Sequence, residues 1–130
     1  MITQSDLLEI TYDMCRPFGV SEMYMGGMFP EEPIQTERIV ILAGRIIDGS
    51  RWDRSSVRVN WCVPDINGKP DLIRLKAVEG LLRETFSRGA GKVGSCTYKW
   101  RRESTETVDT PSLKVHYANL TIKYELLNTN

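Results

Sequence analysis

Apolar residues recur at helical spacing in two stretches of this chain and alternate with polar residues in most of the others. Residues 3–18 predict an amphipathic helix, because their apolar side chains share one face. Thr3 or Ser5 can cap the helix, and Pro17 ends it, since proline disfavours the helical conformation in the residue before it. The apolar face consists of Leu7, Leu8, Thr11, Met14 and Cys15.

Residues 72–86 predict a second helix with a clearer division between its apolar and charged sides. Asp71 can cap its amino end. The string Gly89-Ala90-Gly91 supplies the glycine that helix carboxyl ends favour. The apolar stripe consists of Leu72, Leu75, Val78, Leu82 and Phe86, widened by Leu81.

Four further stretches predict strands. Residues 37–47 are rich in β-branched side chains, and residues 55–63 alternate between apolar and polar, so we expect a hairpin. Residues 96–101 and 113–127 also alternate, and we expect a second hairpin around a polar loop, residues 103–112.

The last predicted strand changes its alternation part of the way along. Its apolar positions are odd-numbered up to Tyr117 and even-numbered from Leu120 onward. A strand cannot move its apolar side chains to the other face without an extra residue, so we predict a β-bulge near Ala118 and Asn119.

Residues 20–36 follow neither pattern, and we interpret them as an extended arm or loop rich in methionine. Methionine adapts to irregular apolar surfaces, so the arm either binds a partner or covers an edge of the chain's own core. Together the elements predict a single domain over residues 1–130 of the α+β class. We expect a mostly antiparallel sheet of about four strands, packed with two helices, plus the Met-rich arm.

Composition indicates a globular chain whose charges cancel. Its 130 residues include 17 basic and 17 acidic ones, which argues against a protein whose main task is to grip bulk nucleic acid or an anionic membrane. No apolar run reaches the roughly 18 residues of a membrane span, and the first residues lack the pattern of a signal peptide. Cys15, Cys62 and Cys96 are widely spaced, so we expect buried thiols in a cytoplasm.

The sequence predicts no enzyme, no cofactor and no metal site. His116 is the only histidine, and its place in a predicted strand indicates a solvent-facing side chain. Three scattered cysteines and this histidine do not have the spacing of zinc ligands. Magnesium needs few protein ligands, so acids such as Asp65 and Asp71 leave that alternative open. Glycines 89 and 91 precede a predicted strand and not a helix, which excludes a phosphate-binding loop.

One string interleaves aromatic and basic residues, as stacking platforms for nucleic acid do: Tyr98-Lys99-Trp100-Arg101-Arg102. Alternation favours a simpler interpretation, in which Tyr98 and Trp100 face inward while Lys99 and Arg101 face water. A second basic set surrounds the first hairpin and is diluted by Asp48 and Asp53; it comprises Arg45, Arg51, Arg54 and Arg58.

The order of elements resembles a family of small tailed-phage proteins, the neck and tail-completion proteins, which include head–tail connectors and tail terminators. Members have a short helix, an extended piece ending in a Gly-Gly-Met-Arg-Pro-like string, hydrophobic strands, an amphipathic helix and a closing β-hairpin. The corresponding strings here are Met25-Gly26-Gly27-Met28-Phe29-Pro30 and Val57-Arg58-Val59-Asn60-Trp61-Cys62-Val63-Pro64-Asp65-Ile66. Phe29 stands where a basic residue would be expected.

The resemblance implies a structural protein without catalytic residues. Such proteins form homo-oligomeric rings, commonly sixfold or twelvefold, that join or terminate the tail at the portal or head. The implied location is the neck or tail of the virion, after assembly in the host cytoplasm. The implied partners are portal, connector or tail proteins, with no membrane and only incidental DNA contact.

A ring requires two different surfaces on each subunit, which meet when the copies are related by rotation. We expect the subunit interface in residues 20–34 and in the loop of the first hairpin. The candidate residues are Met23, Tyr24, Met25, Met28, Phe29, Arg51, Trp52 and Arg54.

Two other classes of protein stay open. One is a small nucleic-acid-binding module or nuclease that uses Lys99, Arg101, Arg102 and nearby acids; salt-dependent DNA binding would distinguish it. The other is a bacterial adaptor domain that works as a monomer or dimer, which native mass spectrometry would distinguish from a ring.

Overall fold

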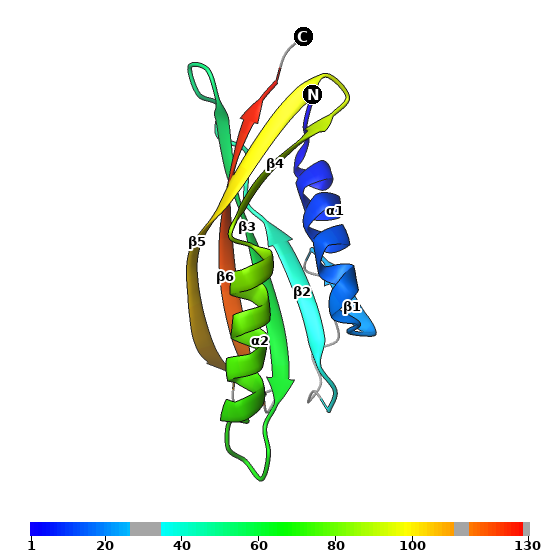
Figure 1. The fold of residues 1–130 in the computed structure, drawn as a ribbon, viewed down its shortest axis with the longest axis vertical. Helices are drawn as coiled ribbons and strands as arrows, with labels where there is room; N and C mark the ends of the chain where they lie inside the picture. The colour runs from blue at the N-terminus through cyan, green and yellow to red at the C-terminus, as the bar shows by residue number, and fades with distance from the viewer. Residues whose placement is uncertain (27–34, 111–114, 129–130) are drawn as a thin grey trace.

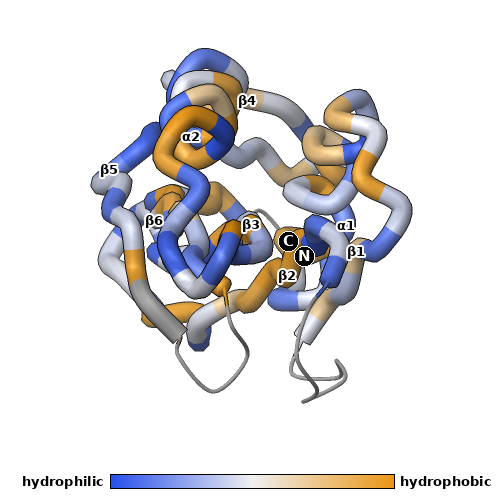
Figure 2. Tube along the Cα trace, turned by 90° about the horizontal axis from the view of Figure 1, so that it is seen from below, coloured by the Kyte–Doolittle hydropathy of each residue, from blue (hydrophilic) through white to orange (hydrophobic). Residues whose placement is uncertain are grey.

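The computed structural model describes residues 1–26, 35–110 and 115–128. Its strands form a single curled sheet with the order β1-β2-β3-β6-β5-β4. In the view from below, the sheet curves like half a barrel and both α-helices lie on its concave side (Figures 1 and 2). In chain order the elements are α1 (Gln4–Cys15), the 3₁₀ helix η1 (Arg16–Phe18), β1 (Glu22–Met25), β2 (Arg38–Ala43), β3 (Asp53–Pro64), α2 (Leu72–Thr85), β4 (Arg88–Val93), β5 (Cys96–Thr110) and β6 (Val115–Leu127).

The sheet has six strands and is mixed, so the predicted sheet of about four mostly antiparallel strands is wrong, although the α+β class holds. The Met-rich segment does not form only an arm, because β1 pairs in parallel with β2 and sets Met23 opposite Ile39. A parallel pair needs a long crossover, so no short turn marks it in the sequence. The apolar run around Tyr24 also gives β1 no alternation that could reveal it. Residues 27–34 of the expected arm lie outside the described residues.

The polar loop predicted over residues 103–112 is also wrong, because β5 continues beside β6 as far as Thr110. This half of β5 shows no apolar alternation because its inward side meets polar groups of α2. The Thr105 hydroxyl lies 3.5 Å from a carboxylate oxygen of Glu79 and accepts from the Arg83 guanidinium at 3.4 Å. A strand that faces a helix through hydroxyls therefore lacks the hydrophobic signal.

The glycines after α2 belong to β4, the strand at the other edge of the sheet. Gly89 lies opposite Trp100 and Gly91 lies opposite Tyr98. A Cβ atom at Gly89 would come within 2.4 Å of the Trp100 ring, so the aromatic side chains occupy the space that larger residues would need. These glycines allow close packing within a strand, as well as ending the helix before it.

The predicted β-bulge near Ala118 and Asn119 is wrong. The pairing of β6 with β3 runs without a shift, and the irregularity lies in β5, between Arg102 and Ser104. The apolar positions change parity because β6 is buried on its outer face near its start and on its concave face along the rest of its length. Even-numbered side chains face the concave core, while Val115 and Tyr117 join Cys62 in a small cluster on the outer face.

The main core fills the space between the concave face and the two helices. Its largest buried side chains include Trp61, Tyr124 and Phe86, and the Tyr124 hydroxyl lies 2.8 Å from the Thr11 hydroxyl. The predicted apolar stripe of α2 is wrong in part, because Leu72 is 69% exposed and Leu81 is 39% exposed.

The predicted caps and buried thiols are confirmed. Thr3 and Asp6 form a capping box on α1, and the Asp71 side chain accepts from the backbone N–H of Arg74 at the start of α2. All three cysteines are buried. Burial raises the pKa of the Cys15 thiol to about 12 and that of the Cys62 thiol to about 11.

A polar link fastens α2 to the end of the sheet. Arg74 donates from Nε to one carboxylate oxygen of Glu37 at 2.6 Å and from its terminal nitrogen to the other at 2.9 Å. The Trp61 indole N–H also donates to Glu37, at 2.9 Å. These bonds, the Arg74 bond above all, hold the pKa of Glu37 below its usual value. Within the described portion of the chain, neither helix is long and apolar enough to cross a membrane.

Candidate functional site

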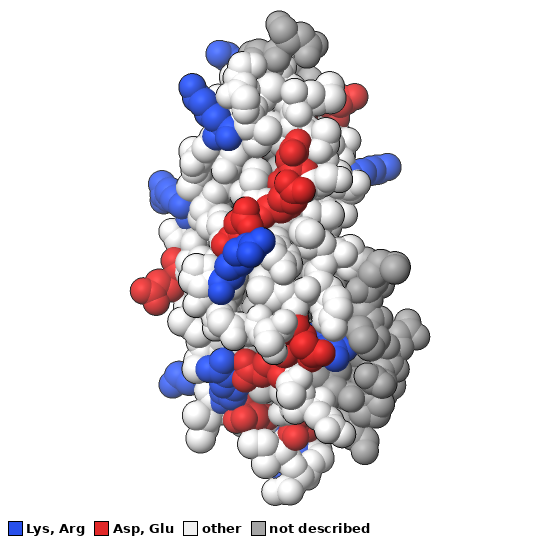
Figure 3. All heavy atoms as spheres, turned by 90° about the vertical axis from the view of Figure 1, so that its right-hand side faces the viewer, with Lys and Arg blue, Asp and Glu red and all other residues white. Residues whose placement is uncertain are grey.

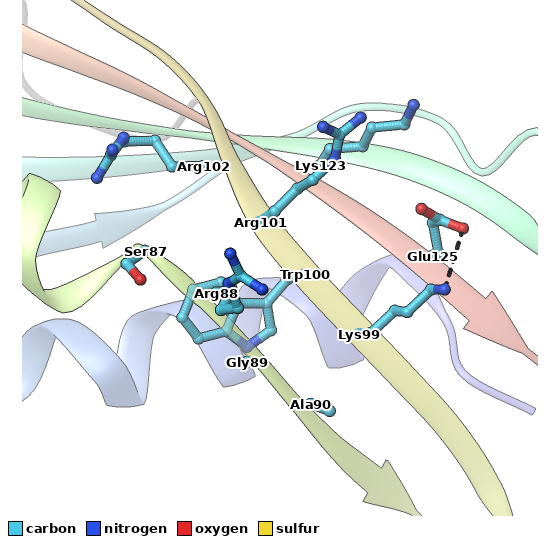
Figure 4. A pocket seen from close by; sticks show the side chains of 10 residues that line it. All are labelled: Ser87, Arg88, Gly89, Ala90, Lys99, Trp100, Arg101, Arg102, Lys123 and Glu125. Atoms are coloured by element: carbon cyan, nitrogen blue, oxygen red, sulfur yellow. Dashed lines mark ion pairs between the residues drawn. The ribbon is translucent and has the colours of Figure 1, made fainter.

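The outer face of β4, β5 and β6 carries a hollow of about 680 Å³ with a basic lining, here called the cationic groove. Figure 4 shows the residues that line it, most of which lie on these three strands. The groove-lining residues at outer-face positions are Arg88, Ala90, Lys99, Arg101, Lys123 and Glu125.

Three cations form a row across the strands of this groove. The register sets Arg88 opposite Arg101, and Arg101 opposite Lys123. Neighbouring strands lie about 4.8 Å apart, so the row is roughly 10 Å long. Within residues 1–26, 35–110 and 115–128, no carboxylate forms an ion pair with any of the three. Like charges that lie directly opposite destabilise a sheet, so this row costs stability in the free protein.

The neighbouring row of the same sheet contains a carboxylate that pairs with a cation. Lys99 lies opposite Glu125, with its ammonium 3.8 Å from the carboxylate. The same ammonium lies 4.5 Å from the centre of the Trp52 ring. Arg54, on β3, lies opposite Glu125 from the other side. The contrast shows that the chain supplies a carboxylate for one row of cations and none for the next.

Acidic side chains gather on a different side of the molecule. Figure 3 looks at the side that carries α1, where acidic residues form a band. Glu9 and Asp13 are exposed there, and Asp13 pairs with Arg16 at 2.8 Å. The balanced net charge therefore includes a local acidic band on this side, with basic residues beside it.

The predicted interface residues of β1 lie at one edge of the sheet. Met23 is half-buried and packs against the core, and Tyr24 is half-buried with the Arg38 guanidinium 5.6 Å from its ring centre. Met25 is 42% exposed. Met28 and Phe29 lie outside the described residues. The β1 group is therefore partly a piece of the core and partly an exposed edge.

The predicted interface residues of the first hairpin lie elsewhere. Arg51 is exposed in the loop, while Arg54 belongs to β3 and is exposed on the outer face. Trp52 is half-buried beside Lys99, at the border of the cationic groove. The sheet order sets β1 apart from this region, because β2 and β3 intervene. The structure thus does not bring the two predicted groups together.

His116 differs from the solvent-facing side chain that the sequence predicts. Its Nδ1 lies 2.7 Å from a carboxylate oxygen of Asp65, and both side chains are largely buried. This contact ties the turn after β3 to the start of β6. Across the described ranges, no group of three or more His, Cys, Asp or Glu side chains is arranged to hold a metal ion.

Sequence reasoning found part of the cationic groove. The predicted split of residues 98–101 is confirmed, since Trp100 is buried and Tyr98 half-buried while Lys99 and Arg101 are exposed. Arg88 and Lys123 were missed, because only the cross-strand register brings them beside Arg101. Alternation in β6 does mark Lys123 as outward-facing, but it does not identify its neighbours.

No protein-family model matches this chain, and no curated protein is similar enough to count as a relative. The proposal for its function therefore rests on the geometry above and on the resemblance seen in the sequence.

Proposed function

We propose that this protein is a non-enzymatic building block that assembles into a ring in the neck or tail of a phage virion. The ring would join or terminate the tail at the portal or head and bind portal, connector or tail proteins. Assembly would take place in the host cytoplasm, in six or twelve copies. The place in the virion and the copy number follow from the sequence resemblance alone.

The observation that supports self-assembly is an open sheet with two unpaired edges. Within the described part of the chain, β1 pairs only with β2, and β4 pairs only with β5. An unpaired edge presents backbone donors and acceptors that can pair with another chain. Because the two edges differ in length and sequence, a contact between them would be heterologous, and its repetition gives a ring when the rotation between copies closes.

The distribution of charge favours the same head-to-tail contact. The β4 side carries exposed Lys92, whereas the α1 side carries the acidic band of Figure 3. Contact between the two sides of successive copies would bring opposite charges together, which guides association and selects one orientation.

Native mass spectrometry and electron microscopy test the proposal. We expect Met25→Lys to raise the protein concentration required for assembly at least about tenfold, since it places a charge at the exposed end of β1. Ile73→Lys is the matched control, because Ile73 is 88% exposed on α2, away from both edges. We expect it to assemble as the wild type does.

Connector-type proteins can require a platform, so the measurement should be repeated on the chain co-expressed with any portal and tail proteins that are found encoded beside it. A wild type that stays monomeric both alone and with those proteins would refute the ring. Assembly lost in Ile73→Lys and kept in Met25→Lys would place the interface on α2 and contradict the edge contact.

A further inference from the structure

We propose that the cationic groove binds the phosphate backbone of nucleic acid, with Arg88, Arg101 and Lys123 as the residues that contact phosphates. Ring assembly through the sheet edges does not require this site, so the inference goes beyond the proposed function. The groove would bind without regard to sequence, because backbone contacts position a nucleic acid but carry no base information.

The first argument is the unbalanced charge of the row. Arg88, Arg101 and Lys123 lie directly opposite one another on three neighbouring strands, without a carboxylate partner in the described parts of the chain. Directly opposed like charges are unfavourable, and a bound anion removes the repulsion. The next row shows that this sheet can neutralise a cation internally, through the Lys99–Glu125 pair.

The second argument is the number and kind of the cations. Their backbone positions span roughly 10 Å, so the three long side chains can reach successive phosphates of one strand. Guanidinium groups bind phosphate oxygens with two parallel hydrogen bonds, and two of the three cations are arginines. A single inorganic phosphate would be too small to neutralise the whole row.

The third argument is access. Ala90 lies opposite Lys99 on the outer face of β4, and its methyl group leaves the groove open beside the cations. Arg88 and Arg101 are exposed, and Figure 4 shows Arg101 and Lys123 extending on the same side of the sheet. A backbone could therefore reach the cations without any movement of the core.

Fluorescence anisotropy with a labelled duplex and a labelled single strand of random sequence tests the proposal. Neutralisation of three phosphates predicts that duplex affinity falls roughly 40-fold between about 50 and 200 mM salt. We expect the triple variant R88Q/R101Q/K123Q to lose binding, and Arg101→Gln alone to lower the salt slope by about 0.9. Arg101→Lys keeps the charge and should keep the slope.

A matched control removes the same charge elsewhere. Arg45, Lys69 and Lys76 are exposed and lie outside the groove, so R45Q/K69Q/K76Q should bind as the wild type does. Equal losses in the two triple variants would overturn the site, since they would indicate diffuse attraction only. Absence of binding to both probes at about 50 mM salt would also overturn it.

One further outcome separates nucleic acid from protein. If the groove variant leaves DNA binding intact and abolishes self-association, the groove contacts the acidic side of a second copy, and the proposal fails. Thermal unfolding of each variant shows that the fold is retained. If the triple variant does not fold, the salt dependence of DNA binding by Arg101→Gln tests the proposal in its place.

Discussion

The two faces of the sheet are built in opposite ways. The concave face is apolar, and its buried polar groups have partners, such as the Thr11 and Tyr124 hydroxyls. The outer face carries the three adjacent cations of the groove, which form no ion pair with a carboxylate among the described residues. The concave face therefore supplies the packing that stabilises the fold. The outer face carries unfavourable repulsion between neighbouring cations, which a bound anion would relieve.

The largest effect on stability is expected for Phe86→Ala, on the concave side. Phe86 is fully buried and meets the Trp100 ring edge-on at 5.9 Å. We expect a loss of about 3–5 kcal/mol in the free energy of unfolding, because the truncation leaves a cavity. Urea denaturation measures it. A loss below about 1 kcal/mol would mean that this side of the core collapses readily and is not tightly packed.

Two glycine substitutions, one in β4 and one in α2, should change stability in opposite directions. Gly89→Ala should lower stability by about 1–3 kcal/mol, because the new methyl group meets the Trp100 ring. Gly80→Ala should raise it by about 0.5–1 kcal/mol, since Gly80 is an exposed position of α2 with open space around its Cβ. Melting curves of the two variants should shift in opposite directions. Shifts of the same sign would contradict the packing described for β4.

Glu37→Gln tests the polar link between α2 and the sheet. We expect a loss of about 1–2 kcal/mol at neutral pH, since the charge-assisted bonds from Arg74 are weakened. The folded-state pKa of Glu37 is depressed, so its contribution is present above the ordinary value of about 4.3 and is lost as the pH falls through the folded value. Urea midpoints of wild type and variant should therefore converge in acid. A gap that stays constant with pH would assign the loss to packing alone.

The smallest effect belongs to the outer face. Arg101→Gln should raise the free energy of unfolding by about 0.2–1 kcal/mol, because it relieves repulsion from Arg88 and Lys123. Lys99→Gln should have the opposite sign, or no effect, since it removes the pair with Glu125. Both are measured by thermal unfolding at low salt. Destabilisation by Arg101→Gln would remove the difference between the two rows.

The parts of the fold that the sequence predicted are those set by neighbouring residues. Thr3 and Asp71 mark the starts of α1 and α2 because capping acts within one helical turn. The hairpin of β2 and β3 was recognisable from alternation and a short connection. By contrast, β1 depends on a parallel partner beyond a long crossover, and the end of β5 depends on hydroxyl contacts with α2.

The cationic groove shows the same limit. Alternation was enough to direct Lys99 and Arg101 toward water. The groove exists, however, because Arg88 and Lys123 come from strands on either side of β5, in a register that the pattern of one strand does not contain. Charge neighbours across a sheet are a tertiary property, so composition and periodicity leave them undetermined.

The position of β6 has a consequence for synthesis on the ribosome. This strand is the sixth in chain order, yet it lies between β3 and β5 and pairs with both along most of its length. Until it leaves the exit tunnel, the two halves of the sheet have no bridge, and each exposes an unpaired strand to other nascent chains. The sheet is therefore completed only when this central strand is inserted between strands made earlier, and such pairing between distant parts of a chain is slow.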